Sequence, residues 1–168
     1  KSVLETNARS VQSLAQSSFD AWIKFYKPNA NSVNSVVSYY KQGALAALAL
    51  DLTVRAKTKN KASLDDFMRA LWNRYTQAQD YEGVMENDIA QLLYESTGVK
   101  CDALLKKLTK STSSVNYERL LKPFGGSFEQ GTVDRARLTL GIDGTITQQG
   151  FVVKHVFEGE AGQWAGIA

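Results

Sequence analysis

Apolar side chains recur at helical spacing over most of the chain. From Val11 to Tyr26 they return every three or four residues, which predicts one helix with an apolar face. Pro28 and the asparagine-rich run after it end this helix. A second helix is predicted from Ser38, a suitable N-cap, to the basic run at 57–61. Its main apolar stripe consists of Leu45, Leu48 and Leu52.

The third helix has the clearest signals in the sequence. Ser63 is its cap, and Asp65 and Asp66 stand in the first turn, where the helix dipole favours acidic groups. An apolar stripe at helical spacing follows, and we expect it to be core. Its members are Leu64, Phe67, Met68, Leu71, Trp72 and Tyr75. Three shorter helices are predicted next, from Glu86 or Asn87 to Gly98, from the cap Asp102 through Leu108, and from the cap Asn116 to Leu121.

The pattern changes after Gly126. The stretches "RARLTLGI" and "TITQQGFVVKHVF" alternate between apolar and polar positions and are separated by glycines, which indicates β-strands joined by turns. The fold class is therefore mainly α, with a helical part at residues 1–127 and a short β segment at 128–168. The chain has no initiator methionine and stops within a turn-and-helix pattern, so we expect a piece of a longer protein.

Charge and composition exclude several kinds of partner and of functional site. The net charge of +3 is small, and the basic residues are spread along the chain, so we expect no nucleic-acid partner. No apolar run reaches the roughly 20 residues of a membrane span, and no signal peptide is visible, so we expect no membrane partner.

Cys101 and His155 are the only residues of their types, which excludes a zinc site built from histidine and cysteine alone and an internal disulfide. A Ser-His-Asp triad is formally possible but lacks a G-x-S-x-G context. We interpret Cys101 as a small buried residue and His155 as structural or exposed.

A second, narrow stripe runs beside the leucines of the second helix. It consists of Tyr40, Gly43, Ala44 and Ala47. One interpretation is that Tyr40 is an ordinary aromatic residue at a helix start and that the small residues fit a tight helix crossing. The other is that they leave room below a functional phenol for a closely packed neighbouring helix. Composition alone favours the first.

Several stretches in order resemble one family. They are "SFDAWIKFYKP", "VSYYKQGALAALALDLTVR" and "SLDDFMRALWNRY", followed by a β segment with "LGI" and "VVKHVFEGEAGQWAGIA". This order resembles the C-terminal part of the glycyl aminopeptidase family, zinc metallopeptidases of the H-E-x-x-H type with a PDZ domain. The resemblance covers nearly the whole chain. It implies the helical C-terminal part of a thermolysin-like catalytic domain, with zinc in the parent protein.

The chain contains no H-E-x-x-H motif, so the resemblance implies that this fragment has no metal ligands, holds no cofactor and is inactive alone. The resemblance also implies that one catalytic element is retained. Related zinc aminopeptidases have a Tyr-Glu-Lys-Gly motif, and Tyr40-Lys41-Gln42-Gly43 matches it with two replacements. The resemblance implies that Tyr40 donates a hydrogen bond to the oxyanion of the tetrahedral intermediate, with Tyr39 as the less favoured candidate. Trp22 and Tyr26 could line a substrate cleft, but packing on a helix face is the simpler interpretation.

The β segment resembles the opening of a bacterial protease PDZ domain. By that resemblance, backbone N–H groups of Leu140, Gly141 and Ile142 would bind the carboxylate of a peptide terminus. An incomplete domain would leave strand edges exposed, which predicts possible homo-oligomers. We therefore consider three hypotheses. In the first, the chain is a piece of a zinc aminopeptidase, and its partners are a peptide substrate and the missing N-terminal part of the catalytic domain. In the second it is a non-catalytic scaffold with a peptide-terminus-binding module, and in the third it is a helical interaction domain without chemistry.

Overall fold

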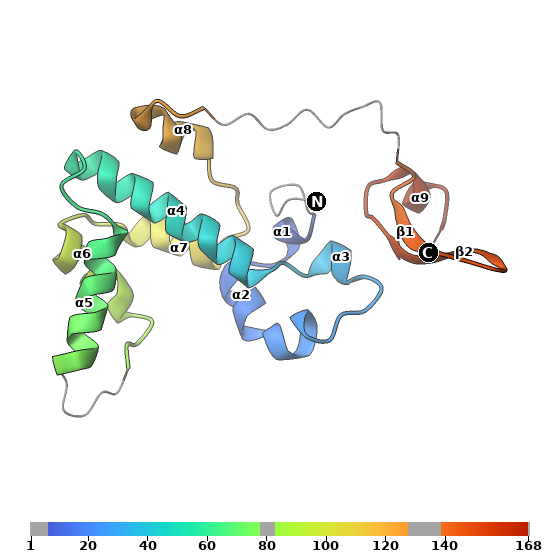
Figure 1. Ribbon diagram of the computed structural model, residues 1–168, viewed down its shortest axis with the longest axis horizontal. Helices are drawn as coiled ribbons and strands as arrows, with labels where there is room; N and C mark the ends of the chain where they lie inside the picture. The colour runs from blue at the N-terminus through green and yellow to red at the C-terminus, as the bar shows by residue number, and fades with distance from the viewer. Residues whose placement is uncertain (1–6, 78–82, 128–138, 168) are drawn as a thin grey trace. The chain divides into compact units, whose positions relative to one another are not determined.

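The computed structural model describes residues 7–77, 83–127 and 139–167. The chain is mainly helical and ends in a small two-stranded sheet, which confirms the predicted fold class (Figure 1). Two compact units are present, one formed by residues 1–42 with 130–168 and the other by residues 43–129. The predicted domain boundary at residues 127 and 128 borders a segment outside the described residues, so it stays a prediction.

The predicted helix from Val11 to Tyr26 is divided into three pieces. They are α1 (Ala8–Val11), α2 (Leu14–Phe19) and the π-helical turn η2 (Ala21–Phe25). Ser13 has an extended backbone and forms a capping box, in which its side chain accepts from the N–H of Gln16 and the Gln16 side chain accepts from the N–H of Ser13. The chain therefore starts a new helix at Leu14 instead of continuing the first.

The apolar face predicted for this region is exposed. Phe19, Trp22 and Ile23 are 89%, 78% and 68% exposed. The buried positions are smaller residues such as Ala21 and Ser17, whose hydroxyl donates to the carbonyl of Val37. Trp22 does pack on the helix face against Tyr26, with ring centroids 5.1 Å apart, but the rest of its side chain is exposed, because the spacing of apolar residues does not determine what covers them. A short helix α3 (Ser32–Ser35) follows, and α1 packs against it.

Helix α4 (Tyr39–Thr58) is the longest in the described chain. It begins as predicted after Ser38, whose hydroxyl accepts from the N–H of Lys41 at 3.4 Å. It ends where Lys59 and Asn60 adopt left-handed backbone conformations. Its buried positions differ from the predicted leucine stripe, because Leu48 is 42% exposed. The buried apolar residues are Ala46, Ala49, Leu50, Leu52 and Val54.

Helix α5 (Leu64–Gln77) begins at the predicted cap. The Ser63 hydroxyl accepts from the N–H of Asp65 at 3.2 Å, and a carboxylate oxygen of Asp66 accepts from the N–H of Ser63 at 2.8 Å. The expectation that its apolar stripe is core is wrong for the described chain, since the helix has no buried residue. The exposed members are Met68, Trp72 and Tyr75.

Helix α5 packs against α6 (Asp88–Thr97), and Arg74 forms an ion pair with Asp88 at 3.7 Å. Gly98 ends α6 in a left-handed conformation, as predicted. Helix α7 (Asp102–Lys110) starts one residue earlier than expected, with Cys101 at the N-cap. Helix α8 (Tyr117–Leu121) has the predicted cap, Asn116, and continues into the 3₁₀ turn η3 (Lys122–Phe124). Buried side chains of this second unit include Leu93, Val99, Cys101, Leu108 and Tyr117.

The β segment is a hairpin followed by a short helix. Strand β1 (Ile142–Thr147) pairs antiparallel with β2 (Gly150–Val156), and α9 (Ala161–Trp164) follows. Most of the predicted strand in "RARLTLGI" lies outside the described residues, and its described end is strand only from Ile142. The register shifts between Asp143 and Gly144, where a side chain would collide with the carbonyl oxygen of Val152.

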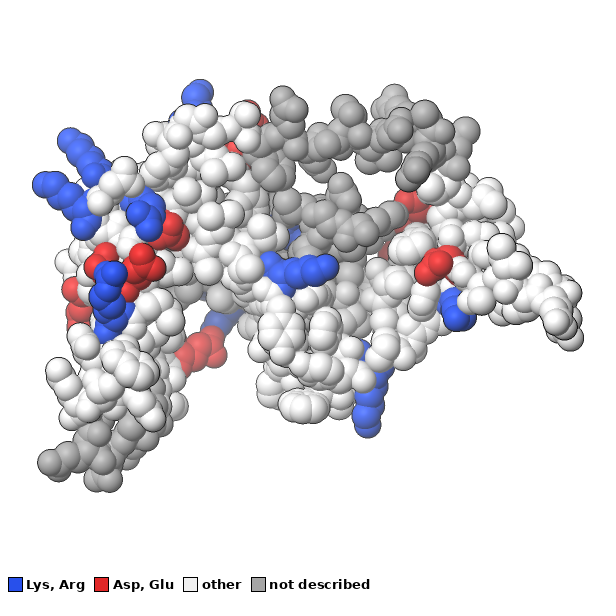
Figure 2. All heavy atoms as spheres, in the orientation of Figure 1, with Lys and Arg blue, Asp and Glu red and all other residues white. Residues whose placement is uncertain are grey.

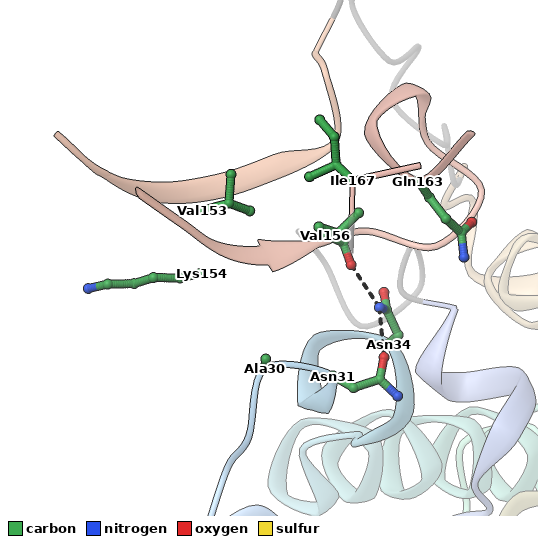
Figure 3. A pocket seen from close by; sticks show the side chains of 8 residues that line it. All are labelled: Ala30, Asn31, Asn34, Val153, Lys154, Val156, Gln163 and Ile167. Carbon is green, nitrogen blue, oxygen red and sulfur yellow. Dashed lines mark hydrogen bonds between the residues drawn. The ribbon is translucent and has the colours of Figure 1, made fainter. Parts of the chain in front are cut away.

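Asparagine side chains attach the C-terminal segment to the helices of its own unit. The amide of Asn34 donates to the carbonyl of Val156 at 2.8 Å (Figure 3). Its oxygen accepts from the N–H of Glu158 at 2.9 Å. The amide of Asn7 donates to the carbonyl of Glu158 at 2.7 Å. A pocket of about 380 Å³ lies beside these contacts. It is lined by Ala30, Asn31, Asn34, Val153, Lys154, Val156, Gln163 and Ile167.

Candidate functional site

Tyr40 stands in the first turn of α4, where the cap at Ser38 fixes the start of the helix. Its side chain is 62% exposed, so it is not enclosed by apolar groups of the described chain. A phenol on an open surface can meet a ligand or another segment of protein. The role that the family resemblance implies for Tyr40 requires this exposure.

Three tyrosine hydroxyls meet at this point. The hydroxyl of Tyr26 lies 2.9 Å from that of Tyr39 and 3.1 Å from that of Tyr40. The rings of Tyr39 and Tyr40 are stacked, with centroids 4.2 Å apart. Phe25 contacts the cluster edge-on, with its centroid 5.4 Å from that of Tyr39 and 5.2 Å from that of Tyr26. We call Tyr26, Tyr39 and Tyr40 the tyrosine cluster.

The hydrogen bonds of this cluster shift two phenols in opposite directions. The pKa of Tyr39 is raised, chiefly because its hydroxyl is hydrogen-bonded to Tyr26. The pKa of Tyr40 is lowered, chiefly by its hydrogen bond with Tyr26. A hydrogen bond that stabilises the phenolate lowers the pKa, and one that holds the proton raises it. The two tyrosines that are adjacent in sequence are therefore chemically different.

Sequence reasoning did not place Tyr26 in this cluster. It is separated from Tyr40 by Pro28 and the asparagine-rich run, so no helical or strand spacing relates the two positions. Its only signal was its aromatic neighbourhood with Trp22 and Phe25. The structure instead brings the hydroxyl of Tyr26, which is 47% exposed, against both tyrosines of α4.

The small-residue stripe below Tyr40 is partly open to solvent in the described chain. Ala44 is exposed, and Gly43 and Ala47 are half-buried. A methyl group added at Gly43 would meet no atom within 4 Å outside its own helix and chain neighbours. The glycine is therefore not explained by a tight crossing within the described residues.

The two replacements in the matched tetrapeptide fall in different environments. Lys41 is exposed, whereas Gln42 is 8% exposed and its side-chain oxygen accepts no hydrogen bond from the described residues. A lysine at this second position would bring a charge into a buried setting, which costs more than a neutral amide. The departure from the family motif at Gln42 is thus consistent with its burial.

Metal ligands are not gathered in the part of the chain that the structure describes, since no group of three histidine, cysteine or acidic residues there could hold a metal ion. Cys101 is 4% exposed, and burial raises the pKa of its thiol, which confirms its interpretation as a buried residue. His155 lies in β2 with Nδ1 3.0 Å from the carbonyl oxygen of Ala30, which confirms a structural position.

The predicted peptide-binding residues lie at the start of the hairpin. The carbonyl of Leu140 accepts from the N–H of Gly162 at 2.6 Å, and that of Gly141 accepts from the N–H of Phe157 at 2.7 Å. Leu140 is 65% exposed, while Ile142 is half-buried in β1. These residues do not line the described pocket near Asn34. Their role in binding a peptide carboxylate stays a prediction.

Charged side chains of both signs are interspersed over the end of α4 and over α5 on the face shown in Figure 2. Several of them are paired, as in the ion pairs of Asp51 with Arg55 and of Asp66 with Arg69. Among the described helices, none is long and apolar enough to cross a membrane.

Two comparisons relate the chain to known proteins. Residues 1–46 match the model of the M61 glycyl aminopeptidase family, and this range includes the tyrosine cluster. Over 99% of its length the chain is similar to the crystal structure of an aminopeptidase N family protein from Idiomarina loihiensis, with 29% identity and a TM-score of 0.79. The chain spans 31% of the length of that protein. No curated protein matches the chain.

These findings define the chain as part of a peptidase-family protein. The matching family model is that of the glycyl aminopeptidases, so the comparisons support the resemblance indicated by the sequence motifs.

Proposed function

We propose that this chain is the helical C-terminal part of the catalytic domain of a zinc-dependent aminopeptidase, and that Tyr40 stabilises the oxyanion formed during peptide hydrolysis. The observation that carries the proposal is the exposed phenol of Tyr40 at the first turn of α4. It lies within the residues that match the family model. The substrates are peptides with small N-terminal residues such as glycine or alanine, as the family resemblance implies.

The chemistry asked of Tyr40 is a hydrogen bond that strengthens as charge develops. A phenol with an ordinary pKa of about 10 is protonated at neutral pH and can donate to an oxyanion. A donor that is already in position does not have to reorganise during the reaction, and one such donor contributes about 10²–10³ in rate. The open surface around Tyr40 leaves room for a substrate and for the upstream part of the catalytic domain.

The zinc of the proposed enzyme belongs to residues outside this chain. The described residues do not fit a zinc site, because they contain no suitable group of ligands. We therefore expect the 168-residue chain alone to be inactive. The upstream part of the catalytic domain is its proposed partner, and it would cover the Tyr40 surface and the small-residue stripe.

The β hairpin supports a second, non-catalytic role as part of a PDZ domain. Leu140, just before the hairpin, and Ile146 within it are 65% and 84% exposed, so this segment offers apolar surface beside a sheet that has two strands among the described residues. A peptide terminus or a second copy of the chain could pair with such an edge. This alternative requires that the 168-residue chain bind peptides by itself, whereas the aminopeptidase proposal does not.

The test is Tyr40→Phe in the longer protein, with a glycine-linked chromogenic substrate. We expect kcat to fall by about 10²-fold or more while KM changes little, because the phenol contributes only when the oxyanion forms. The matched control is Tyr39→Phe, which removes the neighbouring hydroxyl and should cost much less. A loss below about tenfold for Tyr40→Phe would show that the oxyanion role is wrong.

A further inference from the structure

The hydroxyl of Tyr26 lies within hydrogen-bond distance of both other hydroxyls of the tyrosine cluster. Its hydrogen bond is the largest influence on the pKa of Tyr39 and of Tyr40, ahead of the bond that these two make with each other. Tyr26 is the C-terminal flanking residue of η2, and its backbone N–H donates to the carbonyl of Ala21. Its ring is held between aromatic neighbours, with centroids 5.1 Å from Trp22 and 5.2 Å from Phe25. The position of this hydroxyl is therefore set by a packed turn and not by a free side chain.

Counting protons restricts how the three hydroxyls can be arranged. Each phenol has one O–H to donate and can also accept. Tyr26 makes two hydroxyl contacts and has one proton, so it donates in at most one of them. If Tyr40 donated to Tyr26, its only proton would be used inside the cluster. A Tyr40 that donates to an oxyanion must instead accept from Tyr26.

The opposite pKa directions agree with this order. The lowered pKa of Tyr40 is expected of a phenol that accepts from Tyr26, because the bond stabilises its phenolate. The raised pKa of Tyr39 is expected of a phenol whose proton is engaged with Tyr26. The titratable groups that shift the pKa of Tyr40 within the described residues are these two phenols.

We propose that Tyr26 is a positioning residue for Tyr40: Tyr39 donates to Tyr26, Tyr26 donates to Tyr40, and the proton of Tyr40 is thereby directed outward to the substrate. The proposal rests on the proposed function of Tyr40 as the oxyanion donor. It adds a residue from η2 to the site, and it explains why two adjacent tyrosines differ in chemistry. Tyr26 does not touch the reacting atoms in this arrangement.

The first experiment is a titration of the 168-residue chain carrying tyrosine labelled with ¹³C at Cζ, followed by NMR. Tyr26→Phe keeps the ring that packs against Trp22 and Phe25 and removes only the hydroxyl. We expect Tyr40 to titrate below the ordinary tyrosine range in the parent chain and to move upward in Tyr26→Phe. The control is Tyr94→Phe, a tyrosine of α6 in the other unit, which should leave the titration of Tyr40 unchanged.

The direction of the shift decides the order of the hydrogen bonds. A Tyr40 that titrates at or above the ordinary range in the parent chain would overturn the proposal, as would one that Tyr26→Phe leaves unchanged. Tyr39→Phe is a second variant with an intact Tyr26 hydroxyl, and it should retain most of the lowered pKa of Tyr40. If Tyr39→Phe abolishes that shift and Tyr26→Phe does not, the positioning role belongs to Tyr39 and the proposal is wrong.

Kinetics of the longer protein separate this inference from the proposed function. Tyr26→Phe should lower kcat about fivefold, the effect of one neutral hydrogen bond, and much less than Tyr40→Phe does. The activity lost when Tyr40 deprotonates should shift to higher pH in Tyr26→Phe. If the pKa of Tyr40 shifts as expected in Tyr26→Phe but Tyr40→Phe keeps the kcat of the parent enzyme, then the hydrogen-bond order is correct and the oxyanion role is wrong. If Tyr40→Phe lowers kcat as expected but Tyr26→Phe leaves the pKa of Tyr40 unchanged, only the positioning role of Tyr26 is wrong.

Discussion

A carboxylate oxygen of Asp51, in the middle of α4, accepts a hydrogen bond from the backbone N–H of Leu64 at 2.9 Å. Leu64 is the first residue of α5, so its N–H has no partner within its own helix. The other carboxylate oxygen of Asp51 pairs with Arg55 at 2.7 Å. Asp51 thus caps the start of α5 from the side of α4 and links the two helices.

We predict that Asp51→Ala lowers the free energy of unfolding by about 1–2 kcal/mol, because it leaves the N–H of Leu64 without its acceptor. Asp51→Asn retains an acceptor oxygen and loses only the partly exposed ion pair with Arg55, so it should cost about 0.5 kcal/mol. Urea denaturation followed by circular dichroism would measure both. Equal losses in the two variants would mean that the ion pair, and not the cap, is the important contact.

The start of α5 should make the stability of the chain sensitive to acid. The N–H of Ser63 donates to Asp66 and holds the pKa of that carboxyl below its usual value. A depressed folded-state pKa contributes stability above the unfolded pKa of about 3.9, and the contribution is lost as the pH falls through the folded pKa. Thermal midpoints measured between about pH 5 and pH 2 should fall less steeply in Asp66→Asn than in the parent chain. Asp65→Asn, in the same first turn, is the control and should keep most of the parent slope.

Gly43→Ala distinguishes the two explanations of the small-residue stripe. A methyl group at this position meets no atom within 4 Å beyond the local helix, and alanine is the better helix former. The variant should therefore stabilise the 168-residue chain by about 0.5–1 kcal/mol in a denaturation experiment. Gly98→Ala is a contrasting control, since Gly98 has a φ of 71° and alanine there should destabilise the chain.

The same Gly43→Ala substitution should be harmful in the longer protein if a further helix packs on the stripe. We expect lower activity or a lower thermal midpoint there, in contrast to the gain in the 168-residue chain. If Gly43→Ala raised the stability of both proteins, no further helix would pack against Gly43. The comparison needs no knowledge of the substrate, so it tests the proposed upstream partner separately from the chemistry.

Local interactions explain most of what the sequence predicted correctly. The starts of α4, α5 and α8 follow from Ser38, Ser63 and Asn116, whose side chains bond to backbone N–H groups a few residues away. The break at Ser13 was missed although Ser13 and Gln16 form the standard capping-box pattern. The periodicity of the apolar residues outweighed that signal in the prediction.

What could not be predicted depends on contacts between distant parts of the chain. The stripe of Met68, Trp72 and Tyr75 is amphipathic in pattern, but a pattern does not say whether another element covers it, and here all three are exposed. The position of Tyr40 was predictable from a local motif, whereas its contact with Tyr26 depends on how the chain returns after Pro28. Spacing identifies a face, and only the folded chain identifies its neighbour.

The attachment made by Asn34 has an evolutionary consequence. Its amide binds the carbonyl of Val156 and the N–H of Glu158, which every residue type except proline can supply at those positions. Mutations that change the side chains at 156 and 158 can therefore accumulate without breaking these two bonds, while a loss of the single amide at position 34 removes both at once. Natural variation should therefore be tolerated at positions 156 and 158 and restricted at position 34.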